Sequence, residues 1–388
     1  MDIQKINEAM QGYVDNGEMA GAALIIRKND EIILDGKWGF ADIEKKIPIK
    51  DNTIYRVASM TKCITAVAIM KLMEMGKIKI DDPLSKYLPE FANMRVVEDK
   101  RYEFHEGMSM LSLLPKMLFF NMKKVKSVPA KREITIRDLL SHASGLQQRV
   151  AGMMAMMKHN VNDTLEKRIK EYSSYALDFQ PGEATGYSPC AAFDILGYLV
   201  GKLMDMPIDL AYKTLIFDPL GMTDATFKPN NEQKGRLARV YNRNNGRLVD
   251  ITGTPKDIDG IMRTKMGSDY VAGSAGLYCT LSDYDKFGRM LARGGDGFLR
   301  PESVELMHTE AQEKHLEAEP GQVWGLGVRI RQNDGVCTEG TYGWSGAPGT
   351  HFFISPKDNI QVVFATQRMD LGGSGSYISR KIEELVFS

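Results

Sequence analysis

The chain begins with a pattern of apolar residues that predicts a helix followed by a β-hairpin. Within residues 2–16 the apolar positions recur at helical spacing: Ile3, Ile6, Met10 and Val14. Two runs of strand-forming residues come next, at about 22–27 and 32–39, on either side of the turn-forming sequence Lys-Asn-Asp. This order of runs and turn signals predicts two antiparallel strands close to the start of the chain.

A second helix is predicted from residue 59 to about residue 75, after a small polar turn and before Gly76. Its later turns are apolar almost all round, because they contain Ala66, Val67, Ile69 and Met70. A helix that is hydrophobic on every side belongs in the interior of a protein. Lys62, near the start of this helix, is therefore poorly placed to reach solvent.

Helical and strand patterns are distributed unevenly along the rest of the chain. Residues 150–262 carry mostly helical signals and loops, and "TIRDLLSHASGL" predicts a short helix that ends at Gly145. Beyond residue 270, "GLYCTLSDYDKFGRMLARGG" predicts a strand end followed by a helix. The later segments are three strand-like runs and a final helix: 323–331, 349–355, 360–367 and 376–387.

These positions predict an α+β fold, since strand signals lie at both ends of the chain and helices fill the middle. The simplest arrangement is one antiparallel sheet from the N- and C-terminal segments, flanked by helices, with an inserted mainly helical lobe. We expect a discontinuous sheet domain of residues 1–85 and 265–388. The mainly helical domain is expected at residues 86–264, with a variable insertion near 92–130. The cleft between two such lobes is where a ligand site is expected.

Composition narrows the possible functions. The 388 residues carry 50 Lys and Arg against 50 Asp and Glu, so no charge excess points to nucleic acid or an anionic membrane. No apolar run reaches the ~20 residues that span a bilayer, and no secretory signal is visible at the start. The cysteines form no CxxC pair, which favours free thiols over a zinc site: Cys63, Cys190, Cys279 and Cys337. We expect a cytoplasmic protein without a metal or cofactor.

The sequence Ser-Met-Thr-Lys at residues 59–62 is the first candidate for chemistry, and it is the only S-x-x-K in the chain. Side chains three residues apart on a helix share one face, with Cβ atoms roughly 5–6 Å apart. The amine of Lys62 can thus reach the Ser59 hydroxyl and accept its proton. At a helix N-terminus the backbone N–H of Ser59 can also stabilise a developing negative charge. The alternative is an ordinary serine cap with a solvated lysine, and the motif alone does not decide between them.

Two further segments are candidates, although each has a plain structural interpretation. Tyr187 lies just before a helix that Pro189 is suited to start. A tyrosine there either projects into a cleft or packs as an ordinary aromatic. The glycine-dense stretch "GTYGWSGAPGTHFFISP", residues 340–356, predicts a turn leading into a strand. Such a segment is either a simple β-turn or a place where backbone N–H groups approach a ligand closely.

Together, the three segments resemble the signature of the penicillin-recognising serine enzymes, in which S-x-x-K, a tyrosine motif and a glycine-rich strand turn follow one another. Residues 187–189, Tyr-Ser-Pro, take the place of Tyr-Ala-Asn, and residues 344–346, Trp-Ser-Gly, that of Lys-Thr-Gly or His-Thr-Gly. The resemblance is to the class C β-lactamase-like branch, and a tryptophan at that position is similar to the family VIII carboxylesterases. Supporting matches are "LLSHASGL" (139–146) and "GSAGLYCTLSDYDKFGRML" (273–291), so the resemblance covers nearly the whole chain outside part of 92–130. It implies a serine β-lactamase-like fold.

The resemblance implies a role for each matching position. Ser59 is the implied nucleophile that forms an acyl-enzyme, and Lys62 is the implied general base for acylation. Tyr187, either as a phenolate or as a proton relay with Lys62, would protonate the leaving group and activate the deacylating water. Which of the two is the base in each step is left open. The implied oxyanion hole consists of the backbone N–H groups of Ser59 and Ala347. The implied substrate-binding residues are Trp344, Ser345 and Gly346.

The departures from the family pattern carry information on the substrate. Trp344 offers an indole N–H and an apolar face where the family has a cation or a histidine, and Pro189 lacks the amide of asparagine. Both differences weaken the case for β-lactams or D-Ala-D-Ala peptides. The predicted function is a serine carboxylesterase acting on a small-molecule ester of short to medium acyl chain. Met-rich stretches at 105–122 and 153–157 are candidates for adaptable pocket walls.

Other functions stay open. An acyltransferase would pass the same acyl group to an alcohol or amine, and a β-lactamase or D-amino-acid peptidase would use the same centre. A Ser-His-Asp hydrolase is a mechanistic rival, but no serine lies in a G-x-S-x-G elbow. None of the six histidines has a clear partner in the sequence, and His142 is interpreted as structural. A non-catalytic binding protein is the last alternative, and it would need none of Ser59, Lys62 and Tyr187 in register. The oligomeric state is left undetermined.

Overall fold

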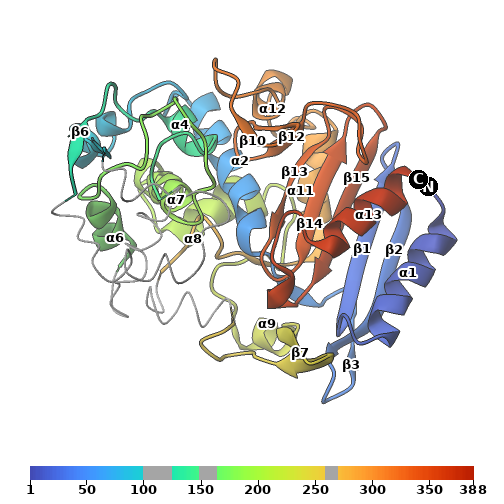
Figure 1. The fold of residues 1–388 in the computed structure, drawn as a ribbon. Helices are drawn as coiled ribbons and strands as arrows, with labels where there is room; N and C mark the ends of the chain where they lie inside the picture. The colour runs from blue at the N-terminus through green and yellow to red at the C-terminus, as the bar shows by residue number, and fades with distance from the viewer. Residues whose placement is uncertain (99–124, 148–163, 258–269) are drawn as a thin grey trace.

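The computed structural model describes residues 1–98, 125–147, 164–257 and 270–388. Its central element is a nine-stranded sheet in the order β10-β11-β12-β13-β14-β15-β1-β2-β3 (Figure 1). Every neighbouring pair in this sheet is antiparallel. Its strands are β1 (Gly21–Lys28), β2 (Glu31–Asp42), β3 (Ile47–Pro48), β10 (Glu317–Glu319), β11 (Gln322–Trp324), β12 (Arg329–Arg331), β13 (Tyr342–Gly346), β14 (Thr350–Ser355) and β15 (Ile360–Thr366).

The N- and C-terminal segments meet where β1 pairs with β15, along nearly the full length of both strands. Both faces of this pair are apolar, because helices cover each of them. α1 (Ile3–Asp15) and α13 (Tyr377–Phe387) pack on one face, and α11 (Leu281–Ala292) packs on the other (Figure 1). The predicted α+β fold, an antiparallel sheet built from both ends of the chain and flanked by helices, is confirmed.

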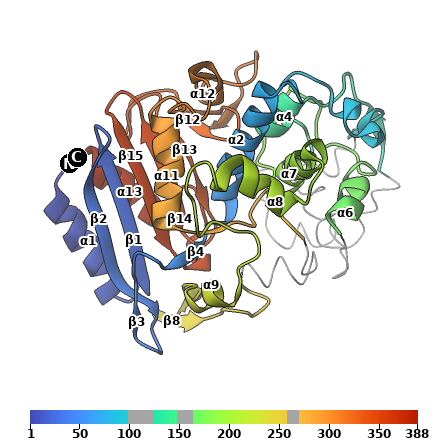
Figure 2. The ribbon, with the colours of Figure 1, turned by 180° about the vertical axis from the view of Figure 1, so that it is seen from behind.

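A mainly helical region lies beside the sheet (Figure 2). Its central helix is α2 (Thr61–Glu74), which has buried residues on all sides and packs against α7 (Ala191–Met204). Apolar residues of α2 and α7 belong to the same core as those of α11 and the inner face of the sheet. The helical region and the sheet therefore share one hydrophobic core, and α2 lies where the two meet.

The remaining described elements are short and connect these layers. The helices are α4 (Ile136–Leu140), α6 (Leu165–Tyr172), α8 (Ile208–Tyr212), α9 (Asn231–Gly235) and α12 (Pro301–Met307). The single turns are η1 (Ala58–Met60), η2 (Leu84–Lys86), η3 (Pro89–Phe91), η6 (Lys213–Phe217) and η7 (Met369–Leu371). Three two-stranded ribbons join β4 (Ile54–Arg56) to β9 (Tyr278–Thr280), β5 (Arg95–Val97) to β6 (Ser127–Pro129), and β7 (Tyr241–Asn244) to β8 (Arg247–Asp250).

The glycine-dense stretch before residue 347 differs from its predicted structure, because it forms strand β13 rather than a turn. The glycines are needed for close packing between strands, not for chain reversal. A Cβ atom on Gly343 would lie 2.0 Å from the carbonyl oxygen of Phe352 in the neighbouring strand. The sequence reads as a turn because glycine clusters usually mark turns.

Three other local predictions were wrong in detail. The run expected at 323–331 contains two strands, β11 and β12, and the mainly helical stretch 150–262 also contains the β7–β8 hairpin. The helix expected to end at Gly145 ends at Leu140, because His142 has a left-handed φ of 54° that turns the chain away.

Some predictions are not tested by the described residues. The Met-rich stretches 105–122 and 153–157 lie outside them, and so does most of the insertion near 92–130. The limits of the two domains stay a prediction. In the part of the chain that the structure describes, no helix is long and apolar enough to cross a membrane. The four cysteines are buried and free, and the cytoplasmic location stays a prediction.

Candidate active site

Ser59 lies on a tight turn that joins β4 to α2. Ala58, the residue before it, has a φ of 45°, a left-handed conformation that is uncommon for a residue with a side chain. The sheet holds this turn in place, because the hydroxyl of Thr350 in β14 donates a hydrogen bond to the Val57 carbonyl at 3.1 Å. A Cβ atom on Gly346 would lie 2.2 Å from that same carbonyl oxygen. Strained backbone persists only where its surroundings impose it, and here β13 and β14 do so.

The hydroxyl of Ser59 contacts both side chains that are predicted to act with it. The Tyr187 hydroxyl lies 2.7 Å from Ser59 Oγ, and the Lys62 amine lies 3.4 Å from it. The alternative role of Ser59 as a helix cap does not occur. Val57 and Met60 occupy the cap positions of η1 and α2, and neither makes a side-chain capping bond.

The amine of Lys62 is held in a fixed position away from water. The residue is 1 % exposed, and its Nζ donates hydrogen bonds to the carbonyl oxygens of Pro189 at 2.8 Å and Ser274 at 2.9 Å. These two carbonyls occupy two of the bonding directions of the nitrogen, and the Ser59 hydroxyl is its third contact. Lys62 is therefore not the solvated surface lysine of the alternative interpretation.

A buried carboxyl group supports the Ser274 segment, whose carbonyl oxygen binds Lys62. Asp194 of α7 accepts the backbone N–H of Ser274 at 3.1 Å and the Tyr270 hydroxyl at 2.8 Å. Complete burial raises the pKa of Asp194 above its usual value. The carboxyl group fixes the segment whose carbonyl holds Lys62. Asp194 is not identifiable as a site residue from the sequence, because an aspartate within a helical pattern does not reveal which tertiary partner it contacts.

Three aromatic rings surround Tyr187. Its ring centroid is 4.9 Å from that of His142, 5.1 Å from that of Trp344 and 6.2 Å from that of Trp324. The two tryptophans also meet each other edge to face at 4.7 Å, and both are almost fully buried. Trp344 was predicted at the site, whereas Trp324 and His142 were not, because only the packing of β11 and α4 brings them there.

Strand β13 presents neighbouring residues to opposite faces of the sheet. Trp344 faces Tyr187, whereas Ser345 faces α13, where its hydroxyl lies 2.7 Å from Nδ1 of His351. His351 is directly opposite Ser345 in β14, and its Nε2 lies 3.2 Å from the Glu383 carboxylate. The structure therefore brings Trp344 to Tyr187 and ties Ser345 into a buried polar cluster beneath α13.

Ser345, His351 and Glu383 contact one another in a row and are the residue types of a hydrolase triad. This combination is not apparent from the sequence. Ser345 is 2 % exposed and belongs to the face of the sheet that α13 covers. The imidazole also meets the hydroxyl through Nδ1 and the carboxylate through Nε2, the reverse of the usual triad. This arrangement supports β13 structurally, and Ser59 remains the candidate nucleophile.

The segment that follows Trp344 lies against the Ser59 turn. Gly346 packs on the Val57 carbonyl as described above, and Ala347 is the next residue, half-buried at the end of β13. Its backbone N–H is thus carried by the part of the sheet that touches η1. The predicted oxyanion pair, the N–H groups of Ser59 and Ala347, fits this proximity and stays a prediction.

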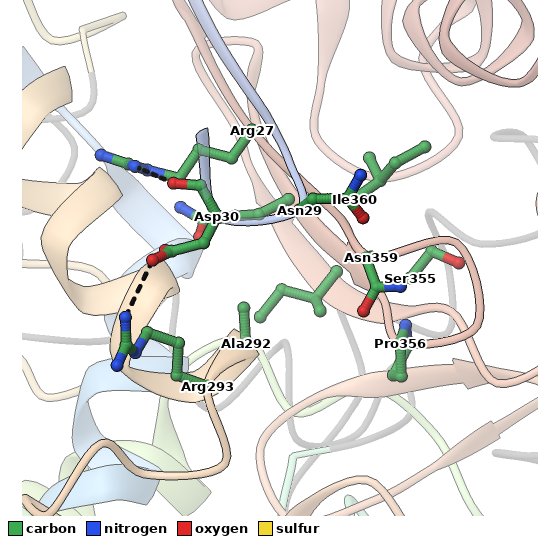
Figure 3. Close-up of a pocket in the computed structure, with 11 residues that line it drawn as sticks. Arg27, Asn29, Asp30, Ala292, Arg293, Ser355, Pro356, Asn359 and Ile360 are labelled. Atoms are coloured by element: carbon green, nitrogen blue, oxygen red, sulfur yellow. Dashed lines mark hydrogen bonds and ion pairs between the residues drawn. The ribbon is translucent and has the colours of Figure 1, made fainter. Parts of the chain in front are cut away.

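A polar pocket of about 400 Å³ lies elsewhere and contains none of the predicted site residues. It is formed by the β1–β2 turn, the end of α11 and the β14–β15 turn (Figure 3). Its charged groups are already paired, since Arg293 bonds to Asp30 and Arg27 bonds to Asp285. The pocket contacts Ser355 at one end of β14. Thr350, which bonds to the turn that carries Ser59, lies at the other end of the same strand. Among the described residues, no group of His, Cys, Asp and Glu could hold a metal ion.

Comparisons with known proteins bear on the family and the fold of the chain. Esterase EstB of Burkholderia gladioli is 25 % identical over 391 residues, which cover 92 % of this chain and 88 % of that protein. The solved structure of EstCE1, described as a hydrolase with promiscuous acyltransferase activity, matches with a TM-score of 0.80 at 24 % identity, over 100 % of this chain and 98 % of that one. Simvastatin synthase LovD of Aspergillus terreus matches with a TM-score of 0.76 at 22 % identity, over 100 % and 98 %.

The structural matches confirm the serine β-lactamase-like fold. The similarity to an esterase supports the esterase-like branch that Trp344 predicted. The sequence profile of the Beta-lactamase family matches residues 6–387, so it spans both strand-forming ends and the helical region between them. The chain therefore belongs to the beta-lactamase family.

Proposed function

We propose that this protein is a serine hydrolase that cleaves carboxylic esters of short to medium acyl chain through an acyl-enzyme on Ser59. The observation that carries the proposal is the contact of Ser59 Oγ with both the Tyr187 hydroxyl, at 2.7 Å, and the Lys62 amine, at 3.4 Å. A nucleophile within reach of two proton-transfer groups is the arrangement that acyl transfer requires. The similarity to Esterase EstB supports the choice of esters.

Tyr187 is the immediate base in this proposal. Its oxygen is at full hydrogen-bonding distance from Ser59 Oγ, whereas 3.4 Å is a weak contact for Lys62. In the structure the Tyr187 hydroxyl donates this hydrogen bond to Ser59 Oγ. In the proposed reacting form Tyr187 is a phenolate, and Ser59 passes its proton to it as its own oxygen attacks the ester carbonyl. The Lys62 ammonium, whose nitrogen is 5.0 Å from the centre of the Tyr187 ring, stabilises that phenolate by its charge.

The remaining steps use the same groups. The backbone N–H groups of Ser59 and Ala347 stabilise the tetrahedral oxyanion. The bond to the alcohol then breaks, and Tyr187 returns its proton to the leaving oxygen. In deacylation Tyr187 takes a proton from water, the hydroxide attacks the acyl carbonyl, and Ser59 recovers the proton as it leaves.

The aromatic surroundings of Tyr187 favour an uncharged substrate. Trp344 and Trp324 present apolar rings beside it, which suit an acyl chain or an ester alcohol rather than a carboxylate. Within the described part of the chain, Nε1 of Trp344 is buried without a hydrogen-bond partner. An unpaired buried donor is costly, so the indole N–H is a group of this site that lacks a polar partner.

The first experiment measures p-nitrophenyl butyrate hydrolysis by the wild type and by Ser59→Ala. Removing the nucleophile is expected to lower kcat by roughly 10⁴-fold or more. Ser174→Ala, which removes an exposed serine after α6, is the matched control and keeps full activity. A fluorophosphonate should label Ser59 alone. Undiminished activity of Ser59→Ala, or an adduct on another serine, would overturn the proposal.

A second candidate function is acyl transfer, which the descriptions of EstCE1 and LovD favour. The acyl-enzyme is the same, and only the acceptor differs. Hydrolysis is therefore measured with and without 1-butanol, and the products are separated. Butyl butyrate as the main product at low alcohol concentration would favour the acyltransferase. Nitrocefin turnover well above ester turnover would instead favour a β-lactamase or a related D-amino-acid peptidase.

A further inference from the structure

His142 occupies an unusual backbone position beside the proposed active site. It follows α4 by two residues, is 1 % exposed, and has a left-handed φ of 54°. Non-glycine residues adopt this conformation infrequently, with asparagine, aspartate and histidine most often among them. The turn directs both the ring and the carbonyl group of His142 towards the segment that carries Tyr187.

That segment, residues 184–188, has no regular secondary structure, so its position depends on individual hydrogen bonds. His142 accepts three of them. Its carbonyl oxygen accepts the Thr185 hydroxyl at 3.0 Å and the Gly186 N–H at 3.2 Å. Its ring atom Nδ1 accepts the Ser188 N–H at 3.0 Å. The bonds fall on both sides of Tyr187 and therefore fix the path of the backbone through it.

The ring of His142 also supports the Tyr187 side chain by packing. Its centroid is 4.3 Å from Trp324, 4.9 Å from Tyr187 and 5.3 Å from Phe193 of α7. Interiors are packed closely, so a ring in this position restricts where the phenol can move. The aromatic contact and the hydrogen bonds therefore both restrict the position of Tyr187, whose hydroxyl lies 2.7 Å from Ser59 Oγ.

The bond to Ser188 sets the protonation of the imidazole. Nδ1 accepts a backbone N–H, so it carries a lone pair and no proton. Burial, and then the charge of Lys62, lower the pKa of His142 well below its usual value. Among the described residues, the Lys62 amine acts on the ring by its charge, and the Tyr187 phenol packs against it. The imidazole therefore stays neutral in solutions where an exposed histidine would be charged.

We propose that His142 is the positioning residue of the site: its unprotonated Nδ1 and its carbonyl oxygen hold Tyr187 within hydrogen-bonding reach of Ser59. The inference rests on the proposed function, because it assigns the placement of the group that takes the Ser59 proton. His142 is not itself the base, since its acceptor Nδ1 is occupied by Ser188 and its other nitrogen, Nε2, carries the proton of the neutral ring. A displacement of about 1 Å at such a group costs on the order of 10²-fold in rate.

The test compares His142→Asn with His142→Gly. Both replacements tolerate a left-handed backbone, so the comparison isolates the side chain from backbone strain. The asparagine oxygen can accept the Ser188 N–H, whereas glycine offers no acceptor. We expect His142→Gly to lower kcat about 100-fold with little change in KM. His142→Asn should recover most of the loss, and free imidazole should partly restore His142→Gly.

Three kinetic outcomes would overturn the inference. These are wild-type kcat in His142→Gly, equal impairment of both variants at wild-type melting temperatures, and a loss confined to KM. Nitrogen-15 spectra of histidine-labelled wild-type protein provide a readout that needs no turnover. The His142 signal, identified by its absence from the His142→Asn spectrum, should show an unprotonated Nδ1 between pH 5 and 8.

If the proposed ester hydrolysis on Ser59 is wrong, the experiments give a different set of results. Ester hydrolysis that survives in Ser59→Ala would reject the proposed function, whereas the nitrogen-15 signal of His142 would be unchanged. A protonated Nδ1 in the wild type would reject the role of His142, whatever the substrate proves to be. The kcat comparison is therefore made only on the activity that Ser59→Ala removes.

Discussion

Tyr187 is the residue on which the proposed chemistry most directly depends. Replacing it with phenylalanine keeps the ring between Trp344 and His142 but removes the oxygen that lies 2.7 Å from Ser59. We expect Tyr187→Phe to lower kcat by about 10²–10⁴-fold, the usual contribution of a positioned acid–base group. Steady-state hydrolysis of p-nitrophenyl butyrate and the labelling rate of Ser59 measure the effect, and both should fall together.

Tyr198→Phe is the matched control, because Tyr198 belongs to α7 but not to the site. Its kcat should equal that of the wild type. If Tyr187→Phe keeps kcat within about threefold of the wild type, a change of less than 1 kcal/mol, then Lys62 is the base and the 3.4 Å contact shortens when substrate binds.

The sequence predicts the site residues that belong to a motif. It does not predict those that reach the site only through tertiary packing. Ser59, Lys62 and Tyr187 were predicted from helix spacing and family resemblance, and the structure brings them together. Trp324 and Asp194 reach the site through packing of β11 and α7. No local pattern encodes such contacts.

Among the elements, α13 is joined to the sheet by a polar cluster as well as by its apolar face. Burial opposes the charge of Glu383, but His351 and Arg331 outweigh this effect and hold the pKa of Glu383 below its usual value. Arg331 donates to the carboxylate at 3.0 Å. A carboxyl group with a lowered pKa stabilises the fold above its unfolded-state pKa, and this contribution is lost as the pH falls towards the folded-state pKa.

Glu383→Gln should therefore destabilise the protein in a pH-dependent way. At pH 7 we expect a loss of about 1–3 kcal/mol in the free energy of unfolding, as for other buried charged hydrogen bonds. The difference from the wild type should shrink as the pH falls below about 4.3, the pKa of an unperturbed glutamate. Urea unfolding at pH 7, 5 and 3.5 measures it, with exposed Glu384→Gln as the control. A pH-independent loss would mean that side-chain shape, not charge, matters.

Element prediction succeeded where periodicity was strong and failed where glycine is dense. The amphipathic α1 and α13 and the long β1–β2 hairpin were predicted to within a few residues. β13 was missed because Gly343 and Gly346 read as turn residues, although each is needed where another backbone comes close. Glycine has no side chain in either role, so the sequence cannot distinguish a turn from a tight strand crossing.

Both ends of the chain lie at the same edge of the structure (Figure 1), and the Met1 amine contacts the Ser388 carbonyl oxygen. A circular permutant can therefore join them with a short linker and open the chain between Asn245 and Gly246, in the exposed turn of β7 and β8. Exposed turns tolerate new termini. We expect near-native melting and ester hydrolysis, measured against the wild type.

A control permutant opened between Asn359 and Ile360, at the end of the β14–β15 turn, would remove the connection between two strands whose paired residues are buried. It should be clearly less stable than the permutant opened at Asn245. Equal stability of the two would show that the connection between β14 and β15 does not contribute to formation of the sheet. The overall arrangement itself was predictable, because the strand signals gather at the two ends of the chain and a single sheet can contain both groups.

The pairing of β1 with β15 has a consequence for how the protein is made. About 330 residues separate the two strands in sequence, and a ribosome adds roughly 5–20 residues per second. The β1–β2 hairpin thus emerges from the exit tunnel and waits on the order of 15–70 s with one hydrogen-bonding edge uncovered. An unpaired strand edge invites association with other nascent chains, so synthesis of this protein in cells should depend on chaperones that shield that edge until translation is nearly complete.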